Sequence, residues 1–146
     1  MSSSDRNKIV AIMKENSSHA YLATCDGDQP VVRPISPVVE DDMSVWIITF
    51  NSSRKVKQIR QNPRICLAFV EHPAGEKAAT VLGRAEIVDS LDEKKRIWNL
   101  VSWDPSQFFP DGPTSDELCL LKIATEKIEW RESQTGGENV YEPAKK

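Results

Sequence analysis

The sequence predicts a mainly β protein, in which six antiparallel strands close into a small barrel with flanking α-helices. Apolar and β-branched residues gather in six strand-length segments along the chain. Tight-turn signals such as Asp26-Gly27-Asp28 join consecutive strands, which favours antiparallel pairing. Long stretches that are apolar on both faces are typical of strands that close into a barrel.

The first half of the chain is expected to hold one helix and three extended segments. In order, they span residues 4–15, 19–25, 30–40 and 43–50. Apolar residues recur at helical spacing in the first segment, and Ser4 can cap its start. Pro34 and Pro37 place the third segment at a sheet edge or a bend, because proline cannot donate to a β-ladder. The run Trp46-Ile47-Ile48 indicates that the fourth segment is buried on both faces.

The second half is expected to hold a short helix, two strands, a helix, a loop and a last strand. These elements span residues 51–61, 64–71, 77–90, 92–103, 104–115 and 117–130. Asn62-Pro63 ends the short helix, and Gly83 marks a bulge in the longest strand. Residues 1–132 are therefore expected to form a single domain, and the polar residues 133–146 a loose tail.

Composition excludes several classes of protein. No apolar run among the 146 residues is long enough to span a bilayer, and the start has no signal-peptide core, so a soluble, cytoplasmic protein is expected. Cys25, Cys66 and Cys119 lie far apart without a CxxC pair, which favours reduced, buried thiols over a disulfide or a zinc site. His19 and His72 lack partners at ligand spacing, so no metal is expected.

Basic residues concentrate in one segment. Residues 51–70 hold five Lys or Arg and no acid, although the whole chain carries a net charge of −3. The rest of the chain therefore sums to −8. Because general nucleic-acid binders are usually basic overall, this segment favours a local anion site over a nucleic-acid surface.

The start of the short helix carries a charge that opposes the helix dipole. Arg54 and Lys55 lie in the first turn, where the helix end is already partly positive, and Ser53 adds a hydroxyl. A phosphate at the helix start would make this arrangement favourable. A solvated basic helix face is the alternative. Arg33, flanked by apolar residues in its strand, either pairs with an anion or lies at an exposed edge.

Three blocks of sequence carry a resemblance to a known family. They are residues 20–25 with 30–34, residues 45–50 with Ser53-Arg54-Lys55, Gln58-Ile59 and Asn62-Pro63, and Gly83-Arg84-Ala85-Glu86. In this order they resemble the FMN-binding split-barrel family that includes pyridoxamine 5′-phosphate oxidase, and most of all its general stress protein branch. The resemblance implies a six-stranded antiparallel split β-barrel with flanking α-helices. It also implies FMN, rather than FAD, a deazaflavin or haem, and a homodimer with FMN at the interface.

The family's cofactor contacts carry over to ten positions. They are Arg33, Pro34, Ile35, Ser36, Ile48, Thr49, Ser53, Arg54, Lys55 and Trp130. Arg54 and Lys55 match the pair that grips the FMN phosphate, and Trp130 resembles a tryptophan that approaches the cofactor from the partner chain. No catalytic acid or base is expected, because the flavin itself performs the hydride and electron chemistry.

The chain departs from the family's oxidases at two positions and at its C-terminal end. Ala78 stands where they carry a glutamine, Val38 stands where they carry a lysine for the substrate phosphate, and their C-terminal substrate segment is missing. These departures imply a flavin-dependent reductase, using NADH or NADPH on an unknown small substrate, rather than a pyridoxamine phosphate oxidase. A non-catalytic flavin- or haem-binding stress or sensor module, with His72 as a remote haem ligand, is the alternative. A third alternative, further from the family, is a protein that binds its partner through the basic patch and has no cofactor.

Late aromatic residues have two possible roles. Trp98, Trp103, Phe108 and Phe109 cluster on the second long helix and the following loop. They either pack in the core or at a dimer interface, or form a lid over the flavin ring, since aromatic faces stack on flavins.

Overall fold

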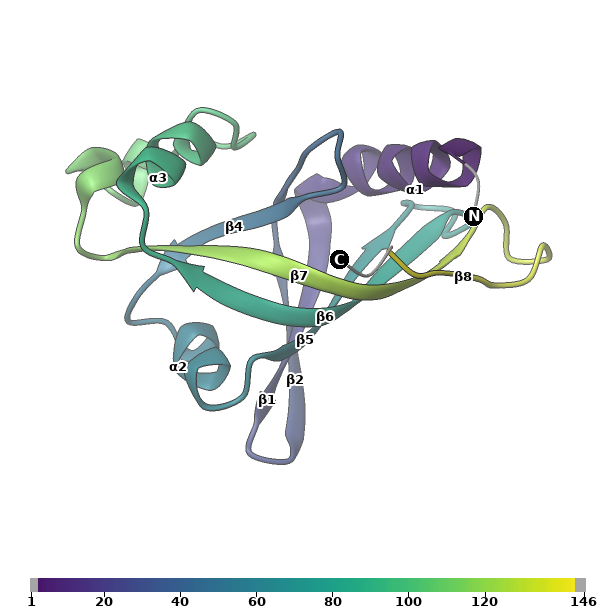
Figure 1. The fold of residues 1–146 in the computed structure, drawn as a ribbon, viewed down its shortest axis with the longest axis horizontal. Helices are drawn as coiled ribbons and strands as arrows, with labels where there is room; N and C mark the ends of the chain where they lie inside the picture. The colour runs from purple at the N-terminus through teal and green to yellow at the C-terminus, as the bar shows by residue number, and fades with distance from the viewer. Residues whose placement is uncertain (1–2, 144–146) are drawn as a thin grey trace.

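The computed structural model describes residues 3–143, which form one curled antiparallel sheet with three α-helices around it (Figure 1). The strands are β1 (Ala20–Asp26), β2 (Gln29–Ile35), β3 (Val38–Val39), β4 (Val45–Phe50), β5 (Arg64–Val70), β6 (Ala78–Val88), β7 (Leu118–Arg131) and β8 (Asn139–Tyr141). The helices are α1 (Ser3–Glu15), α2 (Arg54–Gln61) and α3 (Leu91–Trp98), with 3₁₀ turns at Ser17–His19, Pro105–Gln107 and Gly112–Thr114. The predicted mainly β fold with flanking helices is confirmed.

The order of the strands makes the barrel split rather than closed. Hydrogen-bonded neighbours follow the path β2-β1-β5-β6-β7-β4-β3, and β8 pairs with β7. Every pairing is antiparallel. The path ends at β2 on one side and at β3 on the other, although Ser36-Pro37 joins these strands in sequence. Prolines suit this edge because they cannot donate to a ladder.

The described residues form eight strands, two more than the expected six. One addition is β3, which has two residues and lies within a segment expected to be extended. The other is β8, which pairs with Ile128, Glu129 and Trp130 of β7. The edge of β7 is free for this pairing because β4 covers only its first five residues. The predicted loose tail is therefore wrong at residues 139–141, and residues 144–146 lie outside the described residues.

β4 separates two hydrophobic clusters, which explains why it is apolar almost throughout. Val45 and Ile47 belong to a main core with residues of α1, whereas Trp46 and Ile48 belong to a second core with Ile97 of α3. Side chains alternate between the two faces of a strand, so a strand that is covered on both sides has no solvent-facing position. The predicted burial on both faces is confirmed.

The long β6–β7 pair depends on the glycine in its middle. The register shifts between Leu82 and Gly83, as the predicted bulge requires. A Cβ atom at Gly83 would lie 2.1 Å from the carbonyl oxygen of Ala124 on β7. A residue without a side chain therefore lets the two backbones approach at the bulge.

α3 is shorter than the helix expected over residues 92–103. It ends at Trp98, and the chain then turns so that Val101 and Trp103 pack against the second core. This turn brings the loop after α3 back toward β4. Among the described residues, no helix has the length and apolar character needed to cross a membrane.

Candidate functional site

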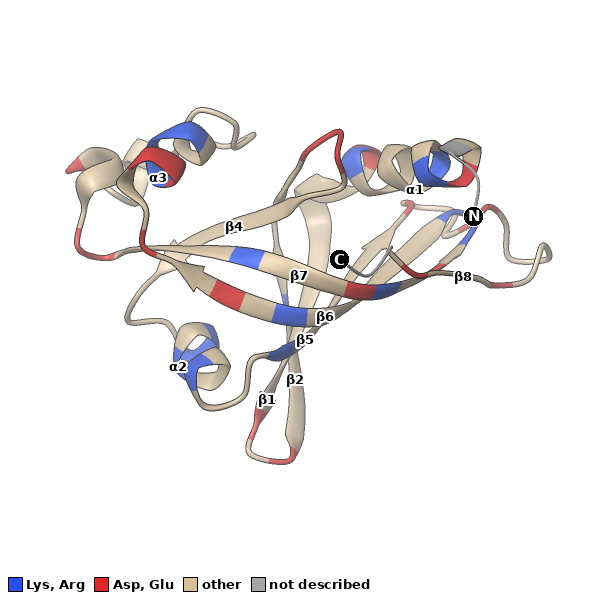
Figure 2. Ribbon diagram, in the orientation of Figure 1, with Lys and Arg blue, Asp and Glu red and all other residues tan. Residues whose placement is uncertain are grey.

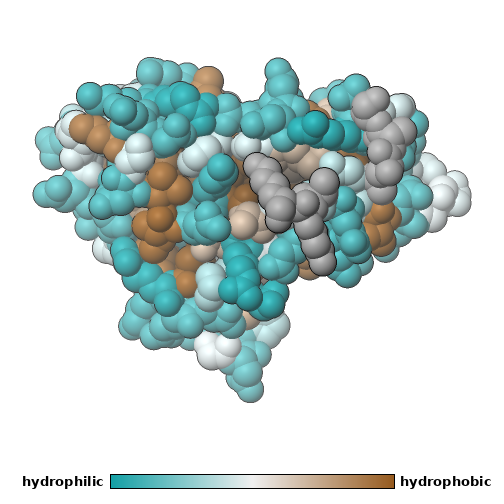
Figure 3. All heavy atoms as spheres, viewed as in Figure 1, coloured by the Kyte–Doolittle hydropathy of each residue, from teal (hydrophilic) through white to brown (hydrophobic). Residues whose placement is uncertain are grey.

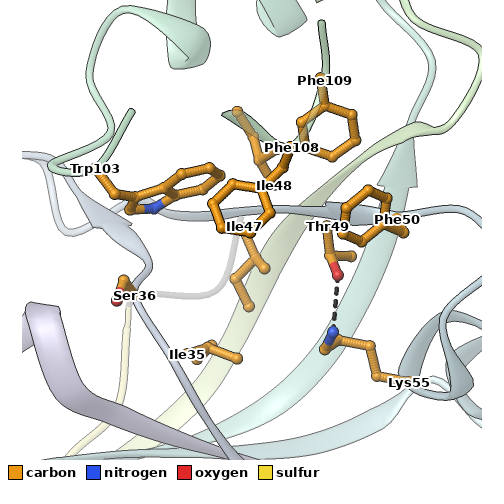
Figure 4. A pocket seen from close by; sticks show the side chains of 10 residues that line it. All are labelled: Ile35, Ser36, Ile47, Ile48, Thr49, Phe50, Lys55, Trp103, Phe108 and Phe109. Atoms are coloured by element: carbon orange, nitrogen blue, oxygen red, sulfur yellow. Dashed lines mark hydrogen bonds between the residues drawn. The ribbon is translucent and has the colours of Figure 1, made fainter. Parts of the chain in front are cut away.

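A pocket lies where the end of β4 meets β2, the start of α2 and the loop after α3 (Figure 4). Its volume is 340 Å³, within the range of roughly 300–1,000 Å³ that is usual for small-molecule sites. Its lining residues are Ile35, Ser36, Ile47, Ile48, Thr49, Phe50, Lys55, Trp103, Phe108 and Phe109. Figure 4 shows the aromatic rings of the loop on one side, with Ile35 and Lys55 opposite them. The pocket is apolar and aromatic, with a positive charge at one end.

Lys55 supplies that charge from the first turn of α2. Ser53 caps the helix, because its Oγ accepts a hydrogen bond from the backbone N–H of Val56 at 3.4 Å. The cap starts α2 at Arg54, four residues after the end of β4, and turns Lys55 back toward the strand. Its Nζ donates to Oγ1 of the buried Thr49 at 2.8 Å (Figure 4). Burial and the nearby Arg33 both lower the pKa of Lys55.

Arg33 lies beside the pocket, among neutral acceptors. Its Nη1 donates to the carbonyl oxygen of Leu22 at 3.2 Å and to Oγ1 of Thr24 at 2.8 Å. Its Nη2 donates to Oε1 of Gln58 at 3.0 Å. The Thr24 hydroxyl in turn donates to the same Oε1 at 2.6 Å. Thr24 is 2% exposed and Gln58 9%, so the groups that hold the guanidinium are buried.

Neither cation has an acidic partner among residues 3–143. The ion pairs of the described residues all involve other basic side chains. Burial also lowers the pKa of Arg33, and no carboxylate counters this effect. Figure 2 shows α2 with Lys and Arg as its only charged residues. Two half-buried cations without a counter-charge are costly, and an anion bound beside both would offset that cost.

The pocket brings together five of the ten predicted cofactor residues: Ile35, Ser36, Ile48, Thr49 and Lys55. Arg33 joins them from the side. Pro34 is exposed, because it points to the opposite face of β2 from its neighbours. Ser53 serves as the helix cap, and Arg54 is exposed and lines no part of the pocket.

Trp130 is a core residue in this structure. It is 4% exposed and belongs to the main core, and its indole Nε1 is buried without a hydrogen-bond partner among the described residues. As placed, the ring presents too little surface to stack on a ligand of another chain. A contact with a partner's cofactor stays a prediction, and it requires the edge of the indole to become exposed.

Two residues that build the site are not among the ten predicted cofactor positions, although both lie in the blocks that carry the family resemblance. Thr24 and Gln58 are polar residues on otherwise buried faces of β1 and α2, and that position is the signal that could have identified them. Among the late aromatics, Trp103 and Phe108 line the pocket, as a lid would. Phe109 lines the pocket and also packs in the second core, where its ring centroid lies 4.7 Å from that of Phe50.

A family model described as pyridoxamine 5′-phosphate oxidase matches residues 7–131 of the chain. The chain belongs to the pyridoxamine 5′-phosphate oxidase family. The match extends from within α1 to the end of β7, so it includes the pocket and both cations. The expected resemblance to this split-barrel family, and to its general stress protein branch, is confirmed by the individual relatives below.

Two known proteins are similar to the chain over different lengths. General stress protein 26 of Bacillus subtilis (strain 168) is 26% identical over 132 residues, which are 88% of this chain and 89% of that protein. Pyridoxine/pyridoxamine 5′-phosphate oxidase of Shewanella frigidimarina (strain NCIMB 400) is 41% identical over 75 residues. That match covers 51% of this chain but only 35% of the oxidase. The chain therefore spans about a third of that oxidase, and nearly all of the stress protein.

The same fold is found in a solved structure. The crystal structure of General Stress Protein 26 from Bacillus anthracis str. Sterne superposes with a TM-score of 0.78 at 20% sequence identity. The superposition covers 94% of this chain and 98% of that one. At this identity the likeness establishes the split-barrel fold.

Proposed function

We propose that this protein binds FMN in the pocket at the end of β4 and acts as an FMN-dependent reductase on a small substrate. One observation carries the proposal. Arg33 and Lys55 are half-buried and have no acidic partner among residues 3–143, and Lys55 lines one end of an apolar, aromatic pocket while Arg33 lies beside it. FMN has the matching chemistry, because a phosphate and a planar aromatic ring are joined in one molecule. Membership of the pyridoxamine 5′-phosphate oxidase family supports the same cofactor.

The residues present fit the two ends of FMN. Lys55 and Arg33 would hold the phosphate together with Ser53 and Arg54 at the helix start, where backbone N–H groups and the helix dipole also favour an anion. The aromatic side chains of the loop after α3 would contact the ring. Bound flavin would supply hydride and electron transfer, while the side chains bind it, orient it and exclude water.

The substrate side of the pocket argues against a true pyridoxamine phosphate oxidase. A second phosphate needs cations of its own, and Lys55 is the one charged residue among those that line the pocket. Val38 packs in the second core, where a charged side chain would be costly. Arg131 donates to the carbonyl oxygens of Gly75 and Glu76 and is thereby committed to the β5–β6 loop.

The haem alternative has less support from the site. His72 is exposed in the β5–β6 loop, and its ring centroid lies 6.3 Å from that of Tyr21 in an edge-to-face arrangement. It lines no part of the pocket. Within residues 3–143, no group of three His, Cys, Asp or Glu could hold a metal ion.

Absorbance and redox measurements test the proposed function. The purified protein, incubated with FMN and then freed of unbound flavin, is expected to show a flavin spectrum that bleaches when NADH or NADPH is added without oxygen. With pyridoxamine phosphate in air, it is expected to form pyridoxal phosphate far more slowly than about one per second, a rate typical of enzymes. A haem band or a blank spectrum would refute the flavin assignment. If flavin binds but no donor reduces it, the protein is a non-catalytic flavin-binding module. Rapid formation of pyridoxal phosphate would identify it as an oxidase.

We further propose that a second copy of the chain covers the outer face of β1 and β5. In the middle of both strands, four residues that point away from the main core are small and apolar: Ala23, Cys25, Cys66 and Ala68. The larger residues Tyr21, Arg64 and Val70 flank them on the same face. A sheet face that meets water normally carries polar residues at these positions. Cys25 and Cys66 are half-buried here rather than buried as expected, whereas Cys119 is buried. β2 contributes to the pocket and neighbours β1, so this face borders the cofactor site, as in a dimer with FMN at its interface.

A charge in the middle of this face is expected to separate the dimer. Ala68→Glu should give a monomer mass in light scattering at low micromolar concentration, because an unpaired buried carboxylate costs several kcal/mol, on the order of the stability of an interface. Lys127→Glu on the exposed part of β7 is the matched control and should stay dimeric. A monomeric wild type, or a dimer of Ala68→Glu as tight as the wild type, would refute this interface.

A further inference from the structure

The groups that hold Arg33 have one property in common: none of them is charged. They are the carbonyl oxygen of Leu22, the hydroxyl of Thr24 and the amide oxygen of Gln58. Buried arginines usually pair with a carboxylate, which holds the guanidinium and cancels its charge together. Here the guanidinium is held in place while its full positive charge remains. The network therefore suits an arginine whose charge is needed for a ligand.

Counting donors shows which edge of Arg33 is free. A guanidinium has five N–H groups. The two on Nη1 go to Leu22 and Thr24, and one of the two on Nη2 goes to Gln58. The remaining N–H of Nη2 and the N–H of Nε have no acceptor among residues 3–143. These two donors belong to the same edge of the guanidinium, the fork that binds a phosphate or carboxylate through two parallel hydrogen bonds.

Gln58 links this fork to the lysine of the same site. It lies three residues after Lys55 on α2, so both side chains occupy one face of the helix. Its Oε1 accepts from Arg33 and from Thr24 at once, which fixes the orientation of the amide. The short helix α2 thus positions both cations: it carries Lys55 itself, and it holds Arg33 through the side-chain amide of Gln58.

We propose that Gln58 is a positioning residue, which aims the free edge of Arg33 at the phosphate of the ligand and, by being neutral, leaves that edge its charge. This inference rests on the proposed function for the identity of the ligand. It adds that recognition of the phosphate depends on a neutral residue that does not touch it.

Glutamate at position 58 separates this role from a structural one. Gln58→Glu keeps the shape and the acceptor oxygen, so the hold on Arg33 persists, but its carboxylate cancels the charge of the guanidinium. FMN affinity should fall at least about tenfold, and riboflavin affinity, which involves no phosphate, should stay within about twofold. Gln61→Glu is the matched control, because it makes the same change at an exposed position of the same helix. Its FMN affinity should stay within about twofold of the wild type.

Fluorescence titration with FMN and riboflavin measures both affinities, and thermal unfolding reports whether each variant is folded. A Gln58→Glu variant that keeps the wild-type ratio of FMN to riboflavin affinity would refute the positioning role. Equal loss of both ligands would assign Gln58 a structural role instead. Thr24→Val gives an independent check, since loss of the hydroxyl should lower the same ratio in a folded protein.

The proposed function and this inference can fail separately. If the wild type binds neither flavin, the flavin assignment falls, and inorganic phosphate becomes the probe. Thermal stabilisation of the wild type and of Gln61→Glu by inorganic phosphate, absent in Gln58→Glu, would still support the positioning role. If inorganic phosphate stabilises all three equally or none of them, the positioning role is refuted.

Discussion

Removal of both cations at the pocket is expected to weaken FMN binding by at least about a hundredfold. In the double variant Arg33→Ala, Lys55→Ala, the phosphate loses its charge-assisted hydrogen bonds, each worth roughly 1.5–3 kcal/mol. Riboflavin, which lacks the phosphate, should bind within a few-fold of its wild-type affinity. Arg54→Ala alone should have a smaller effect, because Arg54 is exposed and lies outside the pocket. Fluorescence titration of both ligands measures these differences.

The pH dependence of binding provides a control for this prediction. Burial and Arg33 hold the pKa of Lys55 below its ordinary value. Below that pKa the ammonium group is charged and binds phosphate, and above it the neutral amine does not, so the preference for FMN over riboflavin should decline as the pH rises. Lys55→Arg stays charged and should lose this alkaline decline. A double variant with unchanged FMN affinity, or a preference that is flat up to the ordinary lysine pKa, would contradict the phosphate assignment.

Gly83→Ala is expected to destabilise the sheet strongly, although it adds only one methyl group. The new Cβ would lie 2.1 Å from the carbonyl oxygen of Ala124, and this neighbour is backbone, which cannot rotate away. One of the two longest strands must shift, at a cost of about 2 kcal/mol or more. Urea unfolding should show a lower midpoint, and thermal unfolding a Tm that falls by several degrees.

Arg84→Ala is the matched control for that variant, because it changes the next residue of β6. It removes only an exposed ion pair with Glu126, which is worth about 1 kcal/mol or less. If Gly83→Ala unfolds at the same urea concentration as the wild type, the close approach of β6 and β7 at the bulge is not a constraint on this fold.

Some features follow from the chain's local chemistry, and these could be predicted. The unbroken apolar run of β4 indicates a strand that is covered on both sides, and the structure places a separate core against each face. Gly83 within a long strand indicates the bulge. The basic residues in the first turn of α2 are also evident from the sequence, and the anion site that they favour, because they oppose the helix dipole unless an anion is bound, stays a prediction. Each of these signals comes from neighbouring residues, so the sequence contains it in full.

Other features depend on which segments the fold brings together. The short strand β8 forms because β7 extends beyond β4 and leaves an edge to pair with, which its own polar residues do not reveal. Trp130 turns inward to the core of its own chain, and Trp103 approaches the pocket because α3 ends early. Periodicity reports the exposure of a face, and it does not report which distant segment covers that face.

By itself, the sequence determined the antiparallel β fold, the buried central strand, the bulge and the basic start of α2. Membership of the pyridoxamine 5′-phosphate oxidase family follows from the same residues. Only the tertiary structure decided that Arg33, Thr24 and Gln58 form one network and that Lys55 lies beside it with no carboxylate partner among residues 3–143. The physical reason is distance along the chain: Arg33 and Gln58 are 25 residues apart and meet only when α2 packs against β1. The hydrogen bonds between these residues, and the lack of a counter-charge beside them, exist only when the distant segments are in contact. Neither can be deduced from one segment of the sequence alone.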